Sequence, residues 1–153
     1  MKATDLLKKQ HKDVKSLFKK IEGTEDSRQR RRILDEVTRS LEAHTLIEEE
    51  IFYPAMRGLD TRKAEEMVAE AYEEHHVVKL VLAELPRVNP EDERFEAKMT
   101  VLSELVEHHA DEEEKEMFKL AQKLGKDELS ALAEQMQARF KDFESSKKGS
   151  EAA

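Results

Sequence analysis

The chain has 153 residues and a formal net charge of −8 at pH 7, and 41% of its residues are charged while 5% are aromatic. This net negative charge, with acidic residues closely following each basic cluster, argues against a nucleic-acid partner. The absence of cysteine excludes disulfides, thiolate metal sites and iron–sulfur clusters, so any metal ion must be held by His, Asp or Glu.

The rest of the composition favours a single all-α domain. Good helix formers such as Ala, Leu, Glu and Lys dominate, and the chain has four glycines and three prolines. No apolar run approaches the roughly 18 residues of a membrane span, and the N-terminal segment lacks the apolar region of a secretory signal. We therefore expect a cytoplasmic protein without a membrane partner.

Glycine and proline residues divide the chain into five helical segments. Gly23 suits the position just after a helix, and Pro54 lies close enough to the end of the second segment to kink or terminate it. Residues 1–144 are expected to form the domain, and residues 145–153 a disordered tail. The helices are expected at about residues 5–22, 28–57, 61–85, 91–124 and 127–143.

The first four helices each carry an apolar seam. Its residues recur at alternating steps of three and four, which is the period of left-handed helix packing. Short turns between long helices make them antiparallel neighbours. The sequence therefore predicts an up-down-up-down antiparallel four-helix bundle with an additional C-terminal helix lying against it.

One histidine lies in the middle of each of these four seams. For a single such histidine, a buried imidazole bonded to a backbone carbonyl is the simpler interpretation. A seam takes two or three positions in seven, so four placements would coincide by chance about one time in a hundred. The four histidines are His11, His44, His75 and His109.

Two of these histidines are followed four residues later by a glutamate, in the pairs His44/Glu48 and His109/Glu113. Residues at this spacing stack one turn apart on one helix face. An ionised glutamate in an apolar core costs several kcal/mol unless it is paired, and no Lys or Arg lies on the seams. Two cations would supply the missing charge, and this donor set suits iron, manganese or zinc better than magnesium or calcium.

Four segments of the sequence resemble the hemerythrin-like proteins, also called HHE cation-binding domains. The resemblance covers about residues 1–124 in the same order and spacing. It is carried by His11, by HTLIEEEIFYP at residues 44–54, by EEHH at residues 73–76 and by HHADEEEKEMF at residues 108–118.

This resemblance implies two iron ions, joined by an oxo or hydroxo bridge, that bind dioxygen or related small molecules. The carried-over ligands are His11, His44, His75 and His109 as terminal ligands, and Glu48 and Glu113 as bridging carboxylates. The chain departs from the oxygen carriers in two places, because Ala71 stands four residues before His75 and because the fourth helix has His and Glu four apart. The departures favour reaction with peroxide, dioxygen or nitric oxide, in sensing, storage or scavenging, over reversible oxygen carriage.

Two further functions stay open at this stage. One is a true enzyme that consumes peroxide in a catalase-like reaction at the same site. The other is a non-catalytic helical interaction module stabilised by an incidental zinc ion. The sequence does not choose between carrier, sensor and enzyme, and it does not set the oligomeric state.

Several residues near the motifs are expected to play ordinary roles. His76 and His108 are rotated about 100° from the seams and are expected on the surface, although either would replace its neighbour if the helix phase were one residue off. Tyr53 and Tyr72 are expected to pack, with a role beside the site as the alternative. A solvated helix face is expected for Glu49, Glu50, Glu112 and Glu114.

Overall fold

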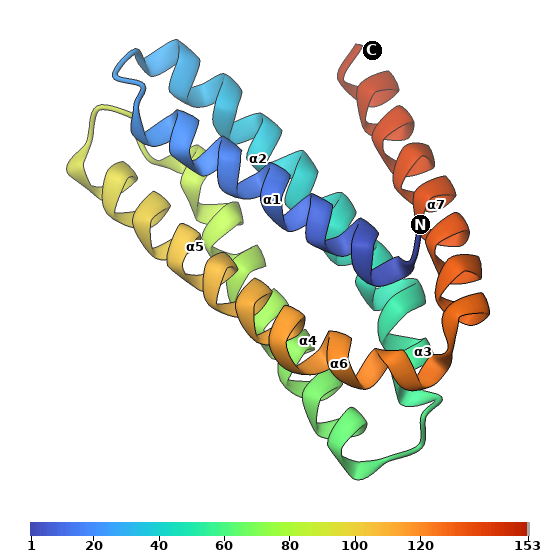
Figure 1. Ribbon diagram of the computed structural model, residues 1–153. Helices are drawn as coiled ribbons and strands as arrows, with labels where there is room; N and C mark the ends of the chain where they lie inside the picture. Colours follow the sequence, from blue (N-terminus) through green and yellow to red (C-terminus); the bar gives the residue numbers. More distant parts are fainter. Residues whose placement is uncertain (153) are drawn as a thin grey trace.

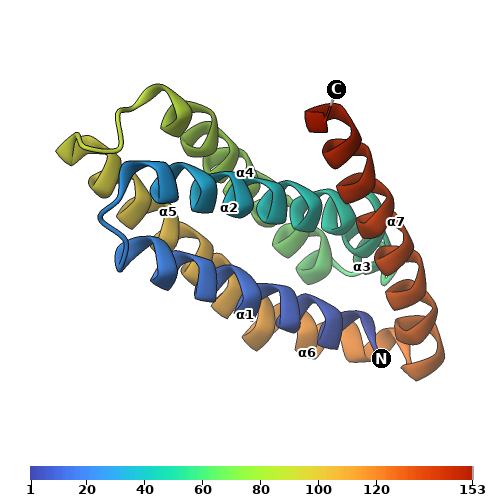
Figure 2. The same ribbon diagram turned by 90° about the horizontal axis from the view of Figure 1, so that it is seen from above.

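Four long helices of the computed structural model run antiparallel to their sequence neighbours and form a bundle, with a fifth helix inclined against one end (Figures 1 and 2). The structure describes the backbone of residues 1–152 and the side chains of residues 1–147. The bundle helices are α1 (Ala3–Glu22), α2 (Ser27–Ile47), α4 (Arg62–Glu84) and α5 (Glu93–Glu112), and the fifth is α7 (Lys126–Ala152). This arrangement confirms the predicted all-α bundle with an additional C-terminal helix.

Short segments extend three of these helices. The second and fourth predicted helices change their hydrogen-bonding pattern part-way. The extensions are η1 (Glu48–Phe52) and α3 (Tyr53–Arg57) after α2, η2 (Leu85–Arg87) after α4, and η3 (Glu113–Met117), α6 (Phe118–Ala121) and η4 (Gln122–Leu124) after α5.

Polar side chains cap the N-termini of three bundle helices. The carboxylate of Asp26 accepts hydrogen bonds from the backbone N–H groups of Arg28 and Gln29, at 2.9 and 3.1 Å. Thr61 and Asp92 accept equivalent bonds at the starts of α4 and α5. These caps satisfy N–H groups that lack a partner within the helix, so the caps define where each helix begins.

The segments η1 and η3 are single turns of π-helix, in which the hydrogen bond spans five residues. The N–H of Tyr53 donates to the carbonyl of Glu48, and the N–H of Phe118 donates to the carbonyl of Glu113. Pro54 lies in the first turn of α3 and does not terminate the helix, which continues to Arg57. No proline follows η3, so proline is not the common cause of these turns. Such turns frequently occur at functional sites.

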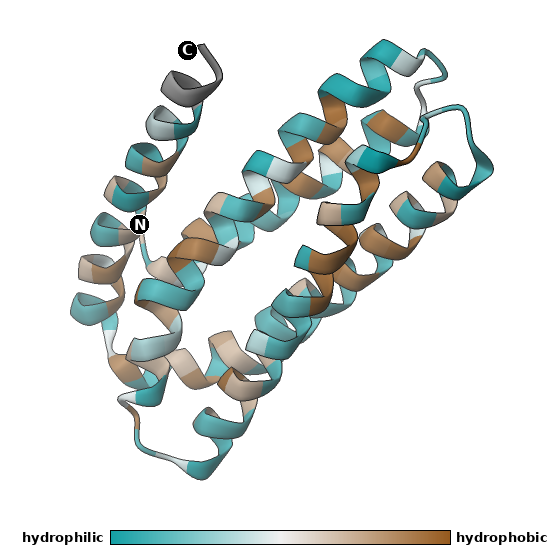
Figure 3. Cartoon of the chain, turned by 180° about the vertical axis from the view of Figure 1, so that it is seen from behind, coloured by the Kyte–Doolittle hydropathy of each residue, from teal (hydrophilic) through white to brown (hydrophobic). Residues whose placement is uncertain are grey.

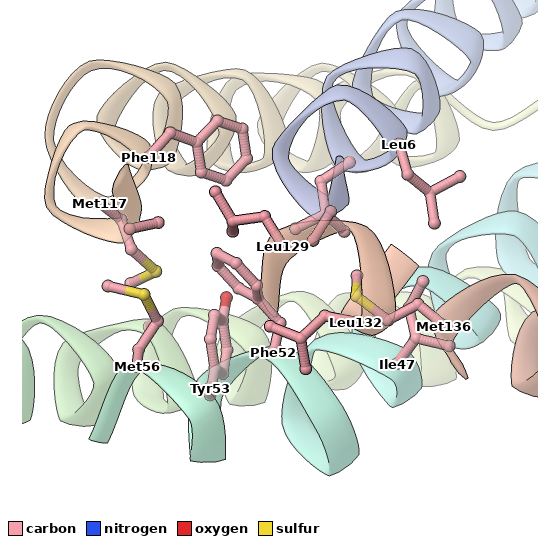
Figure 4. Close-up of a cluster of buried hydrophobic side chains, with 14 of the residues drawn as sticks. Leu6, Ile47, Phe52, Tyr53, Met56, Met117, Phe118, Leu129, Leu132 and Met136 are labelled. Atoms are coloured by element: carbon pink, nitrogen blue, oxygen red, sulfur yellow. The ribbon is translucent and has the colours of Figure 1, made fainter. Parts of the chain in front are cut away.

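The apolar core is divided into two clusters by a layer of polar side chains. The cluster next to α7, here the proximal cluster, includes Leu7, Ile47, Phe52, Ala71 and Met117. Figure 4 shows part of it, which combines Leu6 from α1 and Leu129, Leu132 and Met136 from α7 with Phe52 and Tyr53. The cluster at the other end, here the distal cluster, includes Val14, Phe18, Leu41, Val78 and Val106.

The helix α7 completes the proximal cluster and faces water on its other side. Leu129, Leu132 and Met136 are buried in that cluster, and hydrophilic and hydrophobic residues alternate along the helix (Figure 3). The helix continues through residues 145–152, which the sequence assigns to a tail. Ala153 and the side chains from residue 148 onward lie outside the described part of the chain, so the tail assignment stays a prediction. No helix among the described residues is long and apolar enough to cross a membrane.

We expect Gly125→Ala to destabilise the protein by about 1–3 kcal/mol, because Gly125 turns the chain into α7 at φ 90°, where an L side chain is strained. A Cβ atom there would meet nothing within 4 Å, so the effect would report backbone strain alone. Urea unfolding measures the free energy directly. The matched control is Gly23→Ala, which has φ −84° and ordinary contacts and should shift stability by less than about 0.5 kcal/mol. Equal effects of the two substitutions would contradict the strain argument.

Candidate metal centre

The six predicted site residues meet in the polar layer between the two apolar clusters. Their exposed fractions range from 0% for Glu48 to 8% for His109. Potential ligand atoms fall into two groups, and within each group all atoms lie within 4.8 Å of one another. The first group is His11, His44, Glu48 and Glu113, and the second is Glu48, His75 and His109.

The inward-facing atoms are the Nε2 atoms of the four histidines and the oxygens of the two glutamates. Oε1 of Glu48 lies 3.1 Å from Nε2 of His44 and 3.1 Å from Nε2 of His75. The carboxylate of Glu113 lies 3.2 Å from Nε2 of His11 and, through its other oxygen, 3.2 Å from Nε2 of His109. Each glutamate is therefore shared between one histidine of the α1/α2 half and one of the α4/α5 half.

Several of these atoms lack a hydrogen-bond partner. Nε2 of His11, Nε2 of His44, Oε2 of Glu48 and Oε1 of Glu113 are buried and make no hydrogen bond, since the imidazoles and carboxylates approach to 3.1–3.2 Å without the angle that a hydrogen bond requires. Leaving such groups unpaired costs roughly 1–3 kcal/mol each, and more when the group is charged. Imidazole and carboxylate atoms that converge in this way are the donor set of a cation site, so these residues fit bound metal.

The outward-facing Nδ1 atom of each histidine donates a hydrogen bond to a polar side chain. The distances are 2.9 Å from His11 to Glu114, 2.7 Å from His44 to Gln10, 2.8 Å from His75 to Glu49 and 2.7 Å from His109 to Glu74. A carboxylate only accepts, so Nδ1 carries the proton and Nε2 presents its lone pair inward. Such partners orient metal-binding histidines and increase their basicity.

These contacts repeat with an approximate two-fold relation between the two halves of the bundle. The residue before the first histidine of each half, Gln10 or Glu74, accepts the bond from the second histidine of that half. The residue after each shared glutamate, Glu49 or Glu114, accepts the bond from a histidine of the opposite half. The two π-turns, which both begin at a shared glutamate, follow the same relation.

A family model described as "Hemerythrin HHE cation binding domain" matches residues 2–121. The chain belongs to this family. The crystal structure of an HHE cation-binding domain protein from Mycobacterium kansasii superposes with a TM-score of 0.84 at 30% identity, covering 95% of this chain and 89% of that one.

Two sequence relatives extend the comparison. An uncharacterised protein of Mycobacterium tuberculosis is 30% identical over 149 residues, which are 95% of this chain and 89% of that protein. A DNA nickase of Nostoc is 25% identical over 118 residues, which are 77% of this chain but 33% of the nickase. The chain is thus a metal-binding helical domain of the hemerythrin-like kind.

The two halves of this hemerythrin-like site differ at two positions. His44 is held by the neutral amide of Gln10, whereas His109 is held by the carboxylate of Glu74. Five residues after the shared glutamates stand Tyr53 in one half and Phe118 in the other. Phe118 stacks on His11 with ring centroids 6.1 Å apart, and Tyr53 lies 5.4 Å from His75. The surroundings of His75 and His109 therefore contain a carboxylate and a hydroxyl where those of His11 and His44 contain a neutral amide and an apolar ring.

Tyr53 contacts the site directly, although the sequence favours ordinary packing for it. Its hydroxyl donates to Oε2 of Glu113 at 2.7 Å and lies 3.2 Å from Nε2 of both His75 and His109. Burial, followed by the negative charges of Glu113 and Glu48, raises the pKa of Tyr53 well above its usual value. The sequence offers one signal for this role, which is that Tyr53 stands five residues after Glu48. One turn of π-helix spans five residues, so it brings Tyr53 onto the inward face of the helix.

The assignment of Glu49 and Glu114 to a solvated face is wrong. Both are only partly exposed and hold site histidines, because each shared glutamate directs the next side chain toward the neighbouring helix. Gln10 and Glu74 are also missed by the sequence patterns, since each precedes a histidine and faces the adjacent helix. The surface positions of His76 and His108 are confirmed, and Glu50 is exposed and paired with Arg139 at 2.9 Å.

Without metal, the electrostatics of this site favour protonated histidines. Burial lowers the pKa of His109, but its contacts with Glu113, Glu48 and Glu74 outweigh this effect and raise the pKa well above 6.5. Burial also lowers the pKa of His11 and of His75, and contacts with neighbouring glutamates again outweigh burial and raise both pKa values. Burial also opposes ionisation of Glu48, yet the neighbouring histidines, His44 first, hold its pKa well below the usual value.

These pKa directions predict that the metal-free protein loses stability as pH rises above about 6.5. Histidines with a raised folded-state pKa stabilise the fold fully below their unfolded pKa, and that contribution disappears as pH passes through the folded pKa. Metal binding requires neutral imidazoles, so the metal-loaded protein should behave in the opposite way and lose stability on acidification. Melting temperatures from circular dichroism at pH 6 to 9, with chelator-treated and metal-loaded protein, test both directions.

The matched variants are His109→Gln and His76→Gln. The first should flatten the pH dependence of the metal-free protein, and the second should leave it unchanged because His76 is exposed. A melting temperature of metal-free protein that rises between pH 6 and 9 would contradict the assignment.

Proposed function

We propose that this hemerythrin-like domain is a non-haem di-iron protein that binds or reacts with dioxygen, peroxide or nitric oxide. The observation that carries the proposal is the set of converging, unsatisfied Nε2 and carboxylate atoms in a buried layer. His11 and His44 would hold one ion and His75 and His109 the other, and Glu48 and Glu113 would be shared between them.

The donor chemistry supports iron. Imidazole and carboxylate together suit iron, manganese and zinc, while magnesium and calcium prefer oxygen alone. The buried carboxylates and the acidic partners of the histidines place negative charge around both positions, and such charge stabilises a metal that becomes more positive on oxidation. When bound, iron supplies one-electron redox chemistry and an open position for a small oxygen or nitrogen species.

The residues of the chain prepare the site for such a ligand. The two apolar clusters above and below the polar layer exclude bulk water, which strengthens electrostatic interactions inside. Tyr53 holds a proton on its hydroxyl beside Glu113, within 3.2 Å of His75 and His109. This proton is positioned to be donated to a ligand that develops negative charge in that half of the site.

We expect purified protein from iron-replete cells to contain about two irons per chain and to show near-ultraviolet charge-transfer bands. His44→Ala removes one terminal ligand, so it should abolish these bands and lower the iron content. The control His76→Ala, an exposed histidine on α4, should keep both. Elemental analysis with absorption spectra measures the result. Protein free of iron and zinc whose stability is unchanged by His44→Ala would reject the proposal.

A catalase-like enzyme is the second candidate, and the buried Tyr53 hydroxyl favours it because peroxide cleavage needs a proton donor. Tyr53→Phe retains the six proposed ligands, so we expect about two irons per chain to remain while peroxide turnover falls by at least about tenfold. Oxygen release from hydrogen peroxide, followed with an electrode, measures turnover. If wild-type protein carries two irons and releases no oxygen from peroxide, the enzyme hypothesis is rejected and small-molecule binding is retained.

A non-catalytic interaction module with an incidental zinc ion is the third candidate. It predicts dominant zinc in protein from iron-replete cells and no spectral change on reduction. The same elemental analysis, with spectra taken before and after dithionite, distinguishes it from the di-iron protein.

A further inference from the structure

A cavity of about 50 Å³ opens between α4 and α5 and reaches the buried centre. At its inner end lie His109 and Glu113, which belong to the proposed metal site. Its walls carry four more carboxylates, Glu70 and Glu74 from α4 and Glu112 and Glu116 from the other side. The inner residue Glu113 is 2% exposed, and its Oε1 has no hydrogen-bond partner. The cavity thus joins solvent to the centre along an acidic wall.

Two of the wall carboxylates, Glu74 and Glu112, also form a group of potential metal ligands with His108, which lies outside the cavity wall. Glu74, His108 and Glu112 each offer a ligand atom, and these atoms lie within 4.8 Å of one another. Nε2 of His108 is 3.2 Å from Glu112 and 4.0 Å from Oε2 of Glu74. The His108 side chain is 66% exposed, so a cation can reach it directly from water.

We propose that Glu74, His108 and Glu112 form an entry site that captures a divalent transition-metal ion and passes it through the cavity to the buried centre. The inference rests on the proposed metal function of that centre. The entry site would be a third, transient binding site, and none of its three residues is one of the six proposed ligands of the centre.

Glu74 links the two sites. Its Oε1 accepts the hydrogen bond from Nδ1 of His109, while Oε2 faces His108 on the surface. One imidazole with two carboxylates favours iron, manganese or zinc over magnesium and calcium. Because the group is exposed and has three donors, it holds its ion weakly enough for the ion to dissociate into the cavity. The neighbouring Glu70 and Glu116 add negative charge that concentrates cations at the cavity mouth.

An ordinary charged surface explains part of this group, since His108 and Glu112 are four residues apart on one helix. Such a pair would have no effect on how fast the buried centre is filled. The rate of metal uptake therefore separates an entry site from a surface ion pair.

The experiment uses chelator-treated full-length protein and Co²⁺, whose visible bands report binding without any catalytic activity. We compare wild type with the double variant His108→Ala/Glu112→Gln by stopped-flow absorption and by equilibrium titration. Removal of the entry site should slow filling of the centre by about tenfold, the lower range expected for electrostatic guidance. It should also eliminate a third, weaker ion, while the final spectrum of the two-ion centre stays the same.

The matched control is His76→Ala/Glu73→Gln, which removes the same residue types from exposed positions on α4. It should load at the wild-type rate. Equal loading rates and equal stoichiometry for wild type and the His108→Ala/Glu112→Gln variant would overturn the entry site even if two ions are bound. Failure of wild-type protein to bind Co²⁺ in a manner that depends on His44 would instead overturn the proposed function, and the delivery role with it.

Discussion

Two buried carboxylates, Glu48 and Glu113, impose the constraint on which the rest of this structure depends. Both are almost fully shielded from water, and the side chains that approach them are imidazoles and the hydroxyl of Tyr53. Desolvated carboxylates are costly, so the bundle must bring positive charge into the layer between its apolar clusters. Protonated histidines can supply it in the metal-free protein, and two cations would supply it while freeing the imidazoles to act as ligands.

The approximate two-fold relation between the α1/α2 and α4/α5 halves follows from that shared need. Each half supplies two histidines, a shared glutamate, a π-turn and acceptors for the Nδ1 protons. The relation breaks where Gln10 replaces the carboxylate of Glu74 and where Phe118 replaces Tyr53. The surroundings of the His75/His109 pair are consequently more anionic, include the hydroxyl of Tyr53 from the other half, and adjoin the acidic cavity. The His11/His44 pair is instead covered by the Phe118 ring and the neutral amide of Gln10, so two ions in this hemerythrin-like domain would have different surroundings.

Helical periodicity predicts much of this arrangement, because both the bundle and the six inward side chains follow from residues spaced three and four apart. Glycines and polar caps place the helix boundaries within a few residues, except that the fifth helix, expected to end near residue 143, continues to Ala152. The pattern misses Gln10, Glu49, Glu74 and Glu114, since a helix seam describes what faces the core and not what reaches sideways to a neighbouring helix. It also misplaces Tyr53, because a π-turn adds one residue to the helical period and rotates later side chains onto a new face.

Anomalous diffraction from crystals of iron-loaded protein, measured on both sides of the iron absorption edge, tests the central claim most directly. The account predicts two iron peaks in the polar layer, one beside Nε2 of His11 and His44 and the other beside Nε2 of His75 and His109. Glu48 and Glu113 should lie between the peaks. An iron-free polar layer in such crystals, or a single ion bound without these glutamates, would contradict it.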